Sequence, residues 1–189
     1  MNPVQIFIPK RHGDDRGWFS ETWSTAAFAA RGLDVPFVQD NHSFSAPAYT
    51  LRGLHFQTPP MAQAKLVRVL KGSIFDVAVD LRKGSPTFGR WVGMTLTAAG
   101  GEQLYVPVGF AHGFFTLEPD VEVAYKCSAL YAPANDAGLA WDDPDIAIDW
   151  PLPEGVAPSL SPKDGRQPPL AGVDSPFAYD GFPLEPLEA

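Results

Sequence analysis

Alternating hydrophobic and polar positions dominate the chain as far as about residue 130. The alternating runs are bounded by Gly, Pro, Asn and Asp, which is typical of short strands joined by tight turns. Ten runs are predicted as strands, over residues 4–9, 18–22, 37–45, 50–56, 65–70, 74–80, 91–97, 103–106, 113–117 and 122–128. Strands of this number and length predict an all-β fold, an antiparallel jelly roll.

A helical pattern is persuasive in one place only, residues 24–31 (STAAFAAR). Ser24 is a suitable N-cap and Gly32 a suitable stop. The chain from residue 131 onward is rich in Pro and Asp, and we expect the tail beyond about residue 170 to be loosely ordered. With no repeat, low-complexity block or linker, residues 1–189 are expected to form one domain.

Composition and charge narrow the classes of partner. Fourteen Lys and Arg against 22 Asp and Glu give a net charge of -8, which argues against a nucleic-acid partner. The single cysteine, Cys127, excludes an internal disulfide and a cysteine zinc cluster. No apolar run approaches the length of a membrane span, and the first residues lack the pattern of a signal peptide. We therefore expect a cytoplasmic protein with no membrane partner.

Two segments carry ionisable residues inside otherwise apolar strands, residues 51–72 and 101–115. Their spacing resembles the two motifs of the cupin superfamily, small jelly-roll barrels with a site in the mouth. The four metal-ligand positions of those motifs are occupied here by His55, Gln57, Lys65 and His112. An ammonium group is no metal ligand and an amide is a poor one, so no metal is expected.

A fixed cation in a barrel mouth favours a different chemistry. The Lys65 ammonium can stabilise an oxyanion that develops on a carbonyl substrate. His55 is the candidate base that generates this anion, because an unperturbed imidazole titrates near working pH. Asp76 and Asp80 fall on one side of a strand, and one of them is a candidate partner for Lys65. These residues indicate proton abstraction next to a ketone, with Lys65 holding the enolate.

Six strings narrow the resemblance, in the order DDRGWFSE, QDNHSFS, LRGLHFQ, KGSIFDVAVDLRKGSPTFGRW, PVGFAHGF and SLSPKD. Over about residues 1–170 the chain resembles the dTDP-4-dehydrorhamnose 3,5-epimerase family. The resemblance implies epimerisation of a dTDP-4-keto-6-deoxyhexose at C3 and C5, in rhamnose biosynthesis. A proton leaves from beside the ketone and returns on the opposite face, without metal or organic cofactor. It also implies a homodimer formed through the N-terminal strands.

The resemblance also implies a role for each matching residue. His55 is the base, Asp164 orients it, Tyr125 is the proton donor and Lys65 faces the ketone. Substrate-binding positions fall on Arg16 and Arg52 for the diphosphate, Glu21, Gln39, Asp40 and Asn41 for the nucleotide end, Tyr131 for stacking on thymine, and His112, Asp136 and Lys163 for further contacts. Asp136 departs from the glutamate that the family often has there, which puts that one contact in question.

Several alternatives stay open. An epimerase that inverts only C3 or only C5 shares nearly all these motifs. A metal-dependent cupin dioxygenase or isomerase is disfavoured by Gln57 and Lys65. A sugar-nucleotide-binding cupin without turnover needs no acid/base pair. His112 fits direct contact and structural support equally well, His12 and His42 are expected to be structural, and Arg82, Lys83 and Arg90 are expected on a solvated surface.

Overall fold

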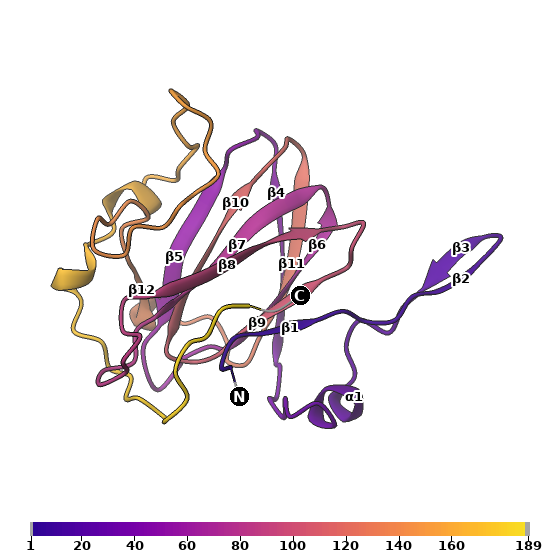
Figure 1. The fold of residues 1–189 in the computed structure, drawn as a ribbon, viewed down its shortest axis with the longest axis horizontal. Coiled ribbons are helices and arrows are strands. Elements are labelled where there is room, and N and C mark those ends of the chain that lie inside the picture. The colour runs from indigo at the N-terminus through magenta and orange to yellow at the C-terminus, as the bar shows by residue number, and fades with distance from the viewer. Residues whose placement is uncertain (1, 188–189) are drawn as a thin grey trace.

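Two antiparallel sheets of five strands each face one another in the computed structural model, which describes residues 2–187 (Figure 1). The first sheet has the order β1 (Gln5–Phe7), β9 (Gln103–Val106), β6 (Lys65–Lys71), β11 (Val121–Cys127) and β4 (Gln39–Ser45). The second has the order β12 (Asp136–Gly138), β5 (Leu51–Gln57), β10 (Phe110–Thr116), β7 (Ser73–Asp80) and β8 (Trp91–Thr97). The predicted antiparallel jelly roll is confirmed.

The remaining elements are short. Strands β2 (His12–Asp14) and β3 (Gly17–Phe19) form a hairpin that projects away from the sheets (Figure 1). Helix α1 (Thr25–Ala29) begins where predicted, with the Ser24 side chain accepting from the Ala27 amide. Single turns of 3₁₀ helix follow at η1 (Pro133–Asn135), η2 (Asp164–Arg166) and η3 (Leu170–Gly172). None of the helices within residues 2–187 is long and apolar enough to cross a lipid bilayer.

Each of the ten predicted strands overlaps a strand of the structure, and the two unpredicted ones are β2 and β12. Both are three residues long, too short for an alternation to be read, and β12 forms only by pairing with β5. Strands need such a neighbour to satisfy their backbone groups, so tertiary pairing decides these two elements.

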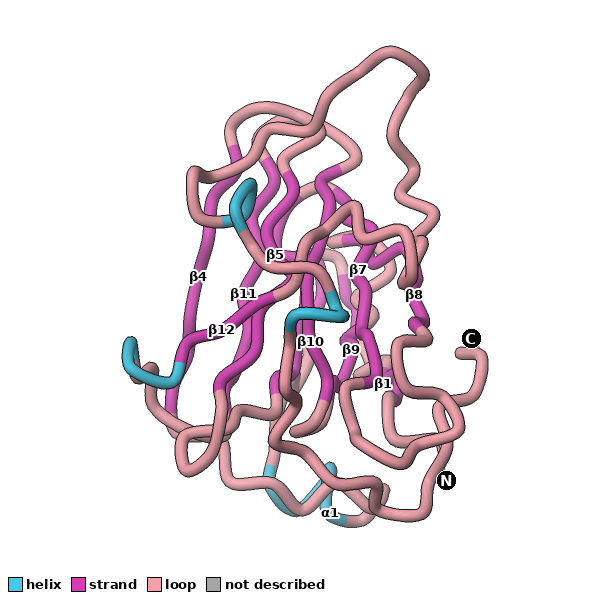
Figure 2. Tube along the Cα trace, turned by 90° about the vertical axis from the view of Figure 1, so that its left-hand side faces the viewer, coloured by secondary structure: helices cyan, strands magenta, loops and turns pink. Residues whose placement is uncertain are grey.

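Three apolar layers hold the fold together. The main core lies between the sheets and includes Val67, Leu104 and Phe114. A second cluster lies between the outer side of the second sheet and the irregular segment that follows β12 (Figure 2). A third packs Phe28 of α1 beside β1, β6 and β9. The open end of the barrel is left to polar side chains.

The backbones of β5 and β10 come unusually close. A side-chain carbon on Gly53 would lie 2.6 Å from the Cα atom of Gly113, so neither position tolerates a larger residue without a shift. The same strand pair brings His55 directly opposite His112. Two glycines therefore set the spacing of two of the candidate site residues.

Arg82 is not on a solvated surface, and that prediction is wrong. Its side chain is 2% exposed, forms two hydrogen bonds with Asp80 and one with Asp180, and lies over the Phe110 ring. Paired carboxylates allow the guanidinium to be buried, which a single sequence does not reveal. Lys83 and Arg90 are exposed, as expected.

The segment after residue 170, expected to be loosely ordered, makes specific contacts with the turn after β7. Ser175 donates to the Leu81 carbonyl, and the Tyr179 amide donates to the Lys83 carbonyl. Asp180 pairs with Arg82 at 2.7 Å. These bonds tie the tail to the barrel.

Candidate active site

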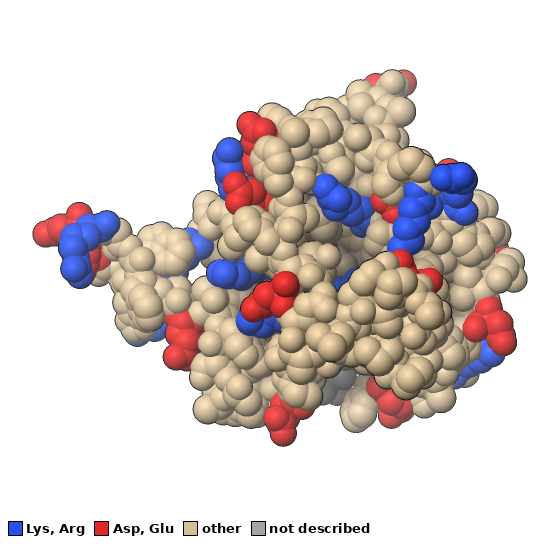
Figure 3. Space-filling model, turned by 180° about the vertical axis from the view of Figure 1, so that it is seen from behind, with Lys and Arg blue, Asp and Glu red and all other residues tan. Residues whose placement is uncertain are grey.

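A polar pocket of about 410 Å³ opens between the two sheets at the end of the barrel. Its walls come from β4, β5, β6 and β11 and from the loop that follows β11. In the view from behind, the molecule is hollowed and Lys and Arg side chains stand near the hollow (Figure 3). The lining residues that carry charge or hydrogen-bonding capacity are Gln39, Asn41, His42, His55, Gln57, Gln63, Lys65, Tyr125, Tyr131, Asp136 and Lys163.

His55 and Asp164 form a hydrogen-bonded pair although 109 residues separate them. The His55 Nε2 atom lies 2.5 Å from the Asp164 Oδ1 atom, and the Ser161 hydroxyl donates to Oδ2 at 2.8 Å. The carboxyl is buried, which opposes its ionisation, yet the bonds from His55 and Ser161 keep its pKa below the ordinary value. An ionised Asp164 thus fixes one ring nitrogen of His55 and stabilises the imidazolium form.

Lys65 and Tyr125 lie on the wall opposite His55. They come from the neighbouring strands β6 and β11, where Lys65 is paired with Cys127, two residues from Tyr125, so the side chains share one face. Desolvation lowers the pKa of Lys65, against the pull of the Asp76 and Asp136 carboxylates. Burial raises the pKa of the Tyr125 phenol, which therefore keeps its proton at neutral pH.

A second histidine–carboxylate pair lies behind the pocket. His112 is buried, and its Nε2 atom lies 2.7 Å from Asp76 Oδ1. Burial lowers the pKa of His112 and so favours the neutral ring. The other carboxylate oxygen, Asp76 Oδ2, is buried with no hydrogen-bond partner among the described residues.

Lys65 does not pair with either aspartate proposed for it. Asp76 is bonded to His112, and Asp80 is bonded to Arg82 at the far end of β7. The even spacing of the two aspartates correctly predicted that they share one side of the strand. It carries no information about which side chain each aspartate bonds.

Tyr131, Asp136 and Lys163 meet at the pocket rim. The Tyr131 hydroxyl donates to Asp136 Oδ2 at 3.1 Å, and this bond raises the pKa of the phenol. Lys163 forms an ion pair with the same oxygen. Asp136, the residue that departs from the family's glutamate, therefore links the β11–β12 loop to the segment that carries Asp164.

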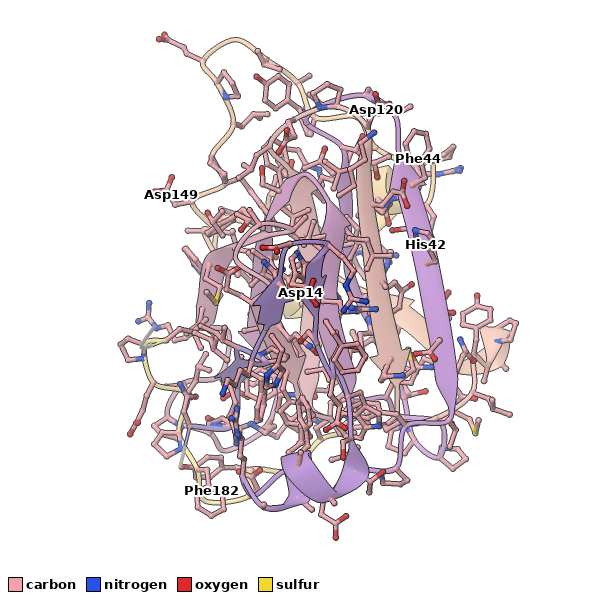
Figure 4. All side chains as sticks on the ribbon, turned by 90° about the vertical axis from the view of Figure 1, so that its right-hand side faces the viewer. Asp14, His42, Phe44, Asp120, Asp149 and Phe182 are labelled. Carbon is pink, nitrogen blue, oxygen red and sulfur yellow. The ribbon has the colours of Figure 1, made fainter. Side chains whose placement is uncertain are left out.

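Five of the candidate binding residues lie off the pocket lining: His112, which is buried behind it, and four others. Arg16 is on the projecting hairpin, exposed and paired at 2.5 Å with Asp14, which Figure 4 labels on that hairpin. Glu21 lies between the hairpin and α1. Arg52 donates to Ser45 Oγ and to the Phe44 carbonyl, at 3.1 and 3.0 Å. Asp40 is exposed and pairs with Lys126.

The donor set in the barrel mouth does not match a metal site. Within residues 2–187 no three His, Cys, Asp or Glu side chains are grouped so that they could hold a metal ion. At the position of the second cupin ligand, Gln57 uses its amide on the backbone, donating to Met61 O at 2.6 Å and accepting from Ala132 N at 2.8 Å. Backbone groups therefore occupy the amide that would have to bind a metal.

Sequence reasoning named Asp164 as the partner of His55, but it missed Ser161, which bonds Asp164, the partner of His112, and the residues that hold the loop after β11. Ser161 stands three residues before Asp164, a spacing typical of local side-chain-to-backbone bonds, and this signal could have identified it. Asp76 as the partner of His112, and the roles of Gln57 and Gln63, depend on strand pairing and loop placement, for which a sequence gives no local signal.

The chain is similar to known proteins over almost all of its length. The family model described as dTDP-4-dehydrorhamnose 3,5-epimerase matches residues 1–172. A protein of that name from Sinorhizobium fredii is 49% identical over 176 residues, which cover 93% of this chain and 89% of the relative.

Solved structures agree with this match. A dTDP-6-deoxy-D-glucose-3,5-epimerase from Legionella pneumophila, in complex with dTDP-4-keto-L-rhamnose, superposes with a TM-score of 0.88 at 44% identity and covers 95% of both chains. A dTDP-4-dehydrorhamnose 3,5-epimerase from Bacillus anthracis, with TDP and PPi bound, has a TM-score of 0.85 at 48% identity and covers 88% of this chain and 93% of its own.

Proposed function

The chain belongs to the dTDP-4-dehydrorhamnose 3,5-epimerase family, and from this premise we propose that it converts dTDP-4-dehydro-6-deoxyglucose to dTDP-4-dehydrorhamnose. One observation carries the proposal: a His55–Asp164 pair and a half-buried phenol, Tyr125, face one pocket from opposite sheets. Inversion of a carbon needs a base on one side and an acid on the other. The reaction belongs to deoxysugar biosynthesis.

His55 removes the proton next to the ketone. Asp164 holds one ring nitrogen, so the other nitrogen can accept the proton, and the ionised carboxylate stabilises the imidazolium that forms. The electron pair left on carbon moves onto the ketone oxygen, and the Lys65 ammonium stabilises the resulting enolate. His112 and Asp76 lie behind the strand that carries His55 and support it.

Tyr125 returns a proton to the carbon from the opposite face. Burial raises the pKa of its phenol, so the group is protonated when the enolate forms. The enolate collapses to the ketone as the carbon–hydrogen bond forms, and bulk water restores both groups. The same steps at the second carbon beside the ketone complete the epimerisation.

The nucleotide end of the substrate binds toward the rim. We assign Tyr131 to stacking on the base, with Gln39, Asn41, Asp136 and Lys163 around it, because all five line the pocket. Arg52, next to Tyr125, is assigned to the diphosphate, since its planar fork suits phosphate oxygens. Asp40 has a peripheral role on the outer side of β4.

A homodimer accounts for Arg16 and Glu21, which lie away from the pocket of their own chain. We assign both to the pocket of a second copy, reached by the β2–β3 hairpin. Trp18 and Phe19 on this hairpin are 59% and 72% exposed, and such an apolar surface is suited to burial against a partner. Light scattering should give the mass of two chains, and Arg16→Ala should weaken dTDP binding without changing that mass.

Solvent-deuterium exchange into dTDP-4-dehydro-6-deoxyglucose, followed by NMR, tests the activity. Exchange at both C3 and C5, lost in His55→Ala, is the expected result. Exchange at one carbon would keep the mechanism and assign the chain to the single-site epimerases. A folded protein that binds dTDP and exchanges neither position would be a binding module, and the proposal would be wrong.

A further inference from the structure

The side chain of Gln57 makes three hydrogen bonds with backbone groups, two of them in the β11–β12 loop and one at Met61 in the β5–β6 loop. Its Nε2 atom donates to the carbonyls of Met61 and Leu130, at 2.6 and 3.1 Å, and its Oε1 atom accepts from the Ala132 amide at 2.8 Å. Both amide hydrogens and one of the two lone pairs of the carbonyl oxygen are therefore in use. At 4% exposure Gln57 has little surface left for a ligand, although it lines the pocket.

Two further glutamines of the pocket hold the same loop. Gln63 donates to the Ala129 carbonyl at 2.7 Å, and Gln39 accepts from the Tyr131 amide at 2.8 Å. Together with the two bonds from Gln57, one backbone group is fixed in each of four consecutive residues, 129–132. The amide of Tyr131 and the backbone on both sides of Tyr131 are therefore held by hydrogen bonds.

Tyr131 itself is 57% exposed. An exposed aromatic side chain on a mobile loop loses conformational entropy when it stacks on a ligand, and this loss weakens binding. A loop whose backbone is already ordered avoids most of that loss. The three glutamines thus order the backbone that carries the ring, while the Tyr131 side chain remains part of the pocket lining.

Gln57 also connects this loop to the reacting end of the pocket. It lies two residues after His55 on β5, and residues two apart on a strand share one face. The distance from the base to the aromatic ring is therefore set by one strand and the hydrogen bonds at its end.

We propose that Gln57 is a positioning residue that fixes the Tyr131 ring relative to His55. The nucleotide base can then contact Tyr131 while the reacting sugar carbon lies at His55. The inference rests on the proposed function for the identity of the ligand. Gln57 itself makes no contact with the substrate, and its effect on binding passes through Tyr131.

The test compares Gln57→Met, Tyr131→Ala and the double variant, with dTDP binding measured by calorimetry and epimerisation by NMR. Methionine matches the length of glutamine but makes none of the three bonds. We expect Gln57→Met to raise the Kd for dTDP and the KM for the sugar nucleotide about tenfold, with kcat changed less than about threefold. In the Tyr131→Ala background the same change should alter the Kd less than about twofold.

Gln167→Met is the matched control, since no hydrogen bond of the Gln167 side chain is found in the described part of the chain and it lies against Gly138. It should leave Kd and KM unchanged. An equal effect of Gln57→Met with and without Tyr131 would overturn the proposal, as would a fall in kcat at unchanged Kd. If the wild type exchanged no deuterium, the proposed reaction would fail, yet the dTDP binding cycle would still decide the role of Gln57.

Discussion

His55 on β5 and His112 on β10 lie opposite each other, and each is paired with an aspartate. The two histidine–aspartate pairs differ in what surrounds them. The His55 side chain is 30% exposed and faces the pocket, while that of His112 is 6% exposed and is covered on all sides. Asp164 receives a further bond from Ser161, whereas Asp76 has a buried oxygen with no partner among residues 2–187. The same two residue types thus form a base at the mouth and a support in the interior.

Access to a substrate, rather than the pair itself, separates the two roles. An imidazole can act as a base only where one nitrogen is free to meet a carbon-bound proton. Burial lowers the pKa of His112 and leaves it a neutral hydrogen-bonding group. The predictions below change one pair at a time, so that each variant has its counterpart in the other pair.

The largest expected difference is between His55→Gln and His112→Gln. Glutamine retains a group that can bond the facing aspartate, so both variants should fold. Loss of the base in His55→Gln should lower kcat by about 10³-fold, within the range of general acid–base contributions. His112→Gln should keep kcat within about tenfold of the wild type. Equal losses of kcat in the two variants would remove the distinction between base and support.

The next comparison is Asp164→Asn against Asp76→Asn. An amide at position 164 cannot stabilise the imidazolium or hold the same tautomer, so kcat should fall by about 10²-fold with KM little changed. The deuterium exchange assay measures this directly. A greater loss of kcat in Asp76→Asn than in Asp164→Asn would contradict the assignment of the orienting role to Asp164.

The two substitutions should affect the free energy of unfolding in the opposite order, with the larger loss in Asp76→Asn. Asp76→Asn places a buried amide next to His112, and the part of the amide that replaces Oδ2 has no partner among the described residues. The substitution should lower the free energy of unfolding by about 2 kcal/mol. Asp164 is also buried, but its partner His55 is open to the pocket, so Asp164→Asn should cost about 1 kcal/mol or less. Urea denaturation followed by tryptophan fluorescence gives both values, and a reversed order would contradict the assignment of His112 and Asp76 to support.

The smallest effect is a pH dependence of stability. Burial lowers the pKa of His112 in the folded state below its ordinary value of 6.5, so between those two values the unfolded chain binds more protons than the folded chain. The contribution of His112 to stability is therefore complete above about pH 6.5 and is lost as the pH falls toward the folded-state pKa.

Urea denaturation at about pH 7.5 and 5.5 checks this expectation. The wild type should lose more stability over the interval than His112→Gln, whose side chain does not titrate. His55→Gln serves as the counterpart in the other pair. If the wild type and His112→Gln changed by the same amount, protonation of His112 would not be coupled to unfolding.

The fold was largely predictable because its strands carry their own signal. Turn residues mark where strands end, so β8 and β9, which are flanked by glycines or a proline, were predicted with the bounds that the structure has. β12 was missed because its pairing with β5 is decided by distant residues. The burial of Arg82 was missed for the same reason, since Asp180 lies 98 residues away.

The candidate site was predictable in part. Cupin spacing identified His55, Lys65 and His112, and resemblance added Tyr125 and Asp164. Neither source could show that Asp164 folds back onto His55, because that contact depends on the path of the segment after β12. The location of Arg16 outside the pocket of its own chain is likewise a property of the whole fold.

The bonds of Arg82 make the chain's last segment part of the folding unit. The family match ends at residue 172, yet the guanidinium buried beneath β7 finds Asp180 and the Phe182 carbonyl beyond that point. A protein shortened at residue 172 would retain every residue assigned to chemistry, but the Nη1 atom of this buried guanidinium would lose both of its hydrogen-bond partners. For expression work, the boundary of homology is therefore the wrong place to cut.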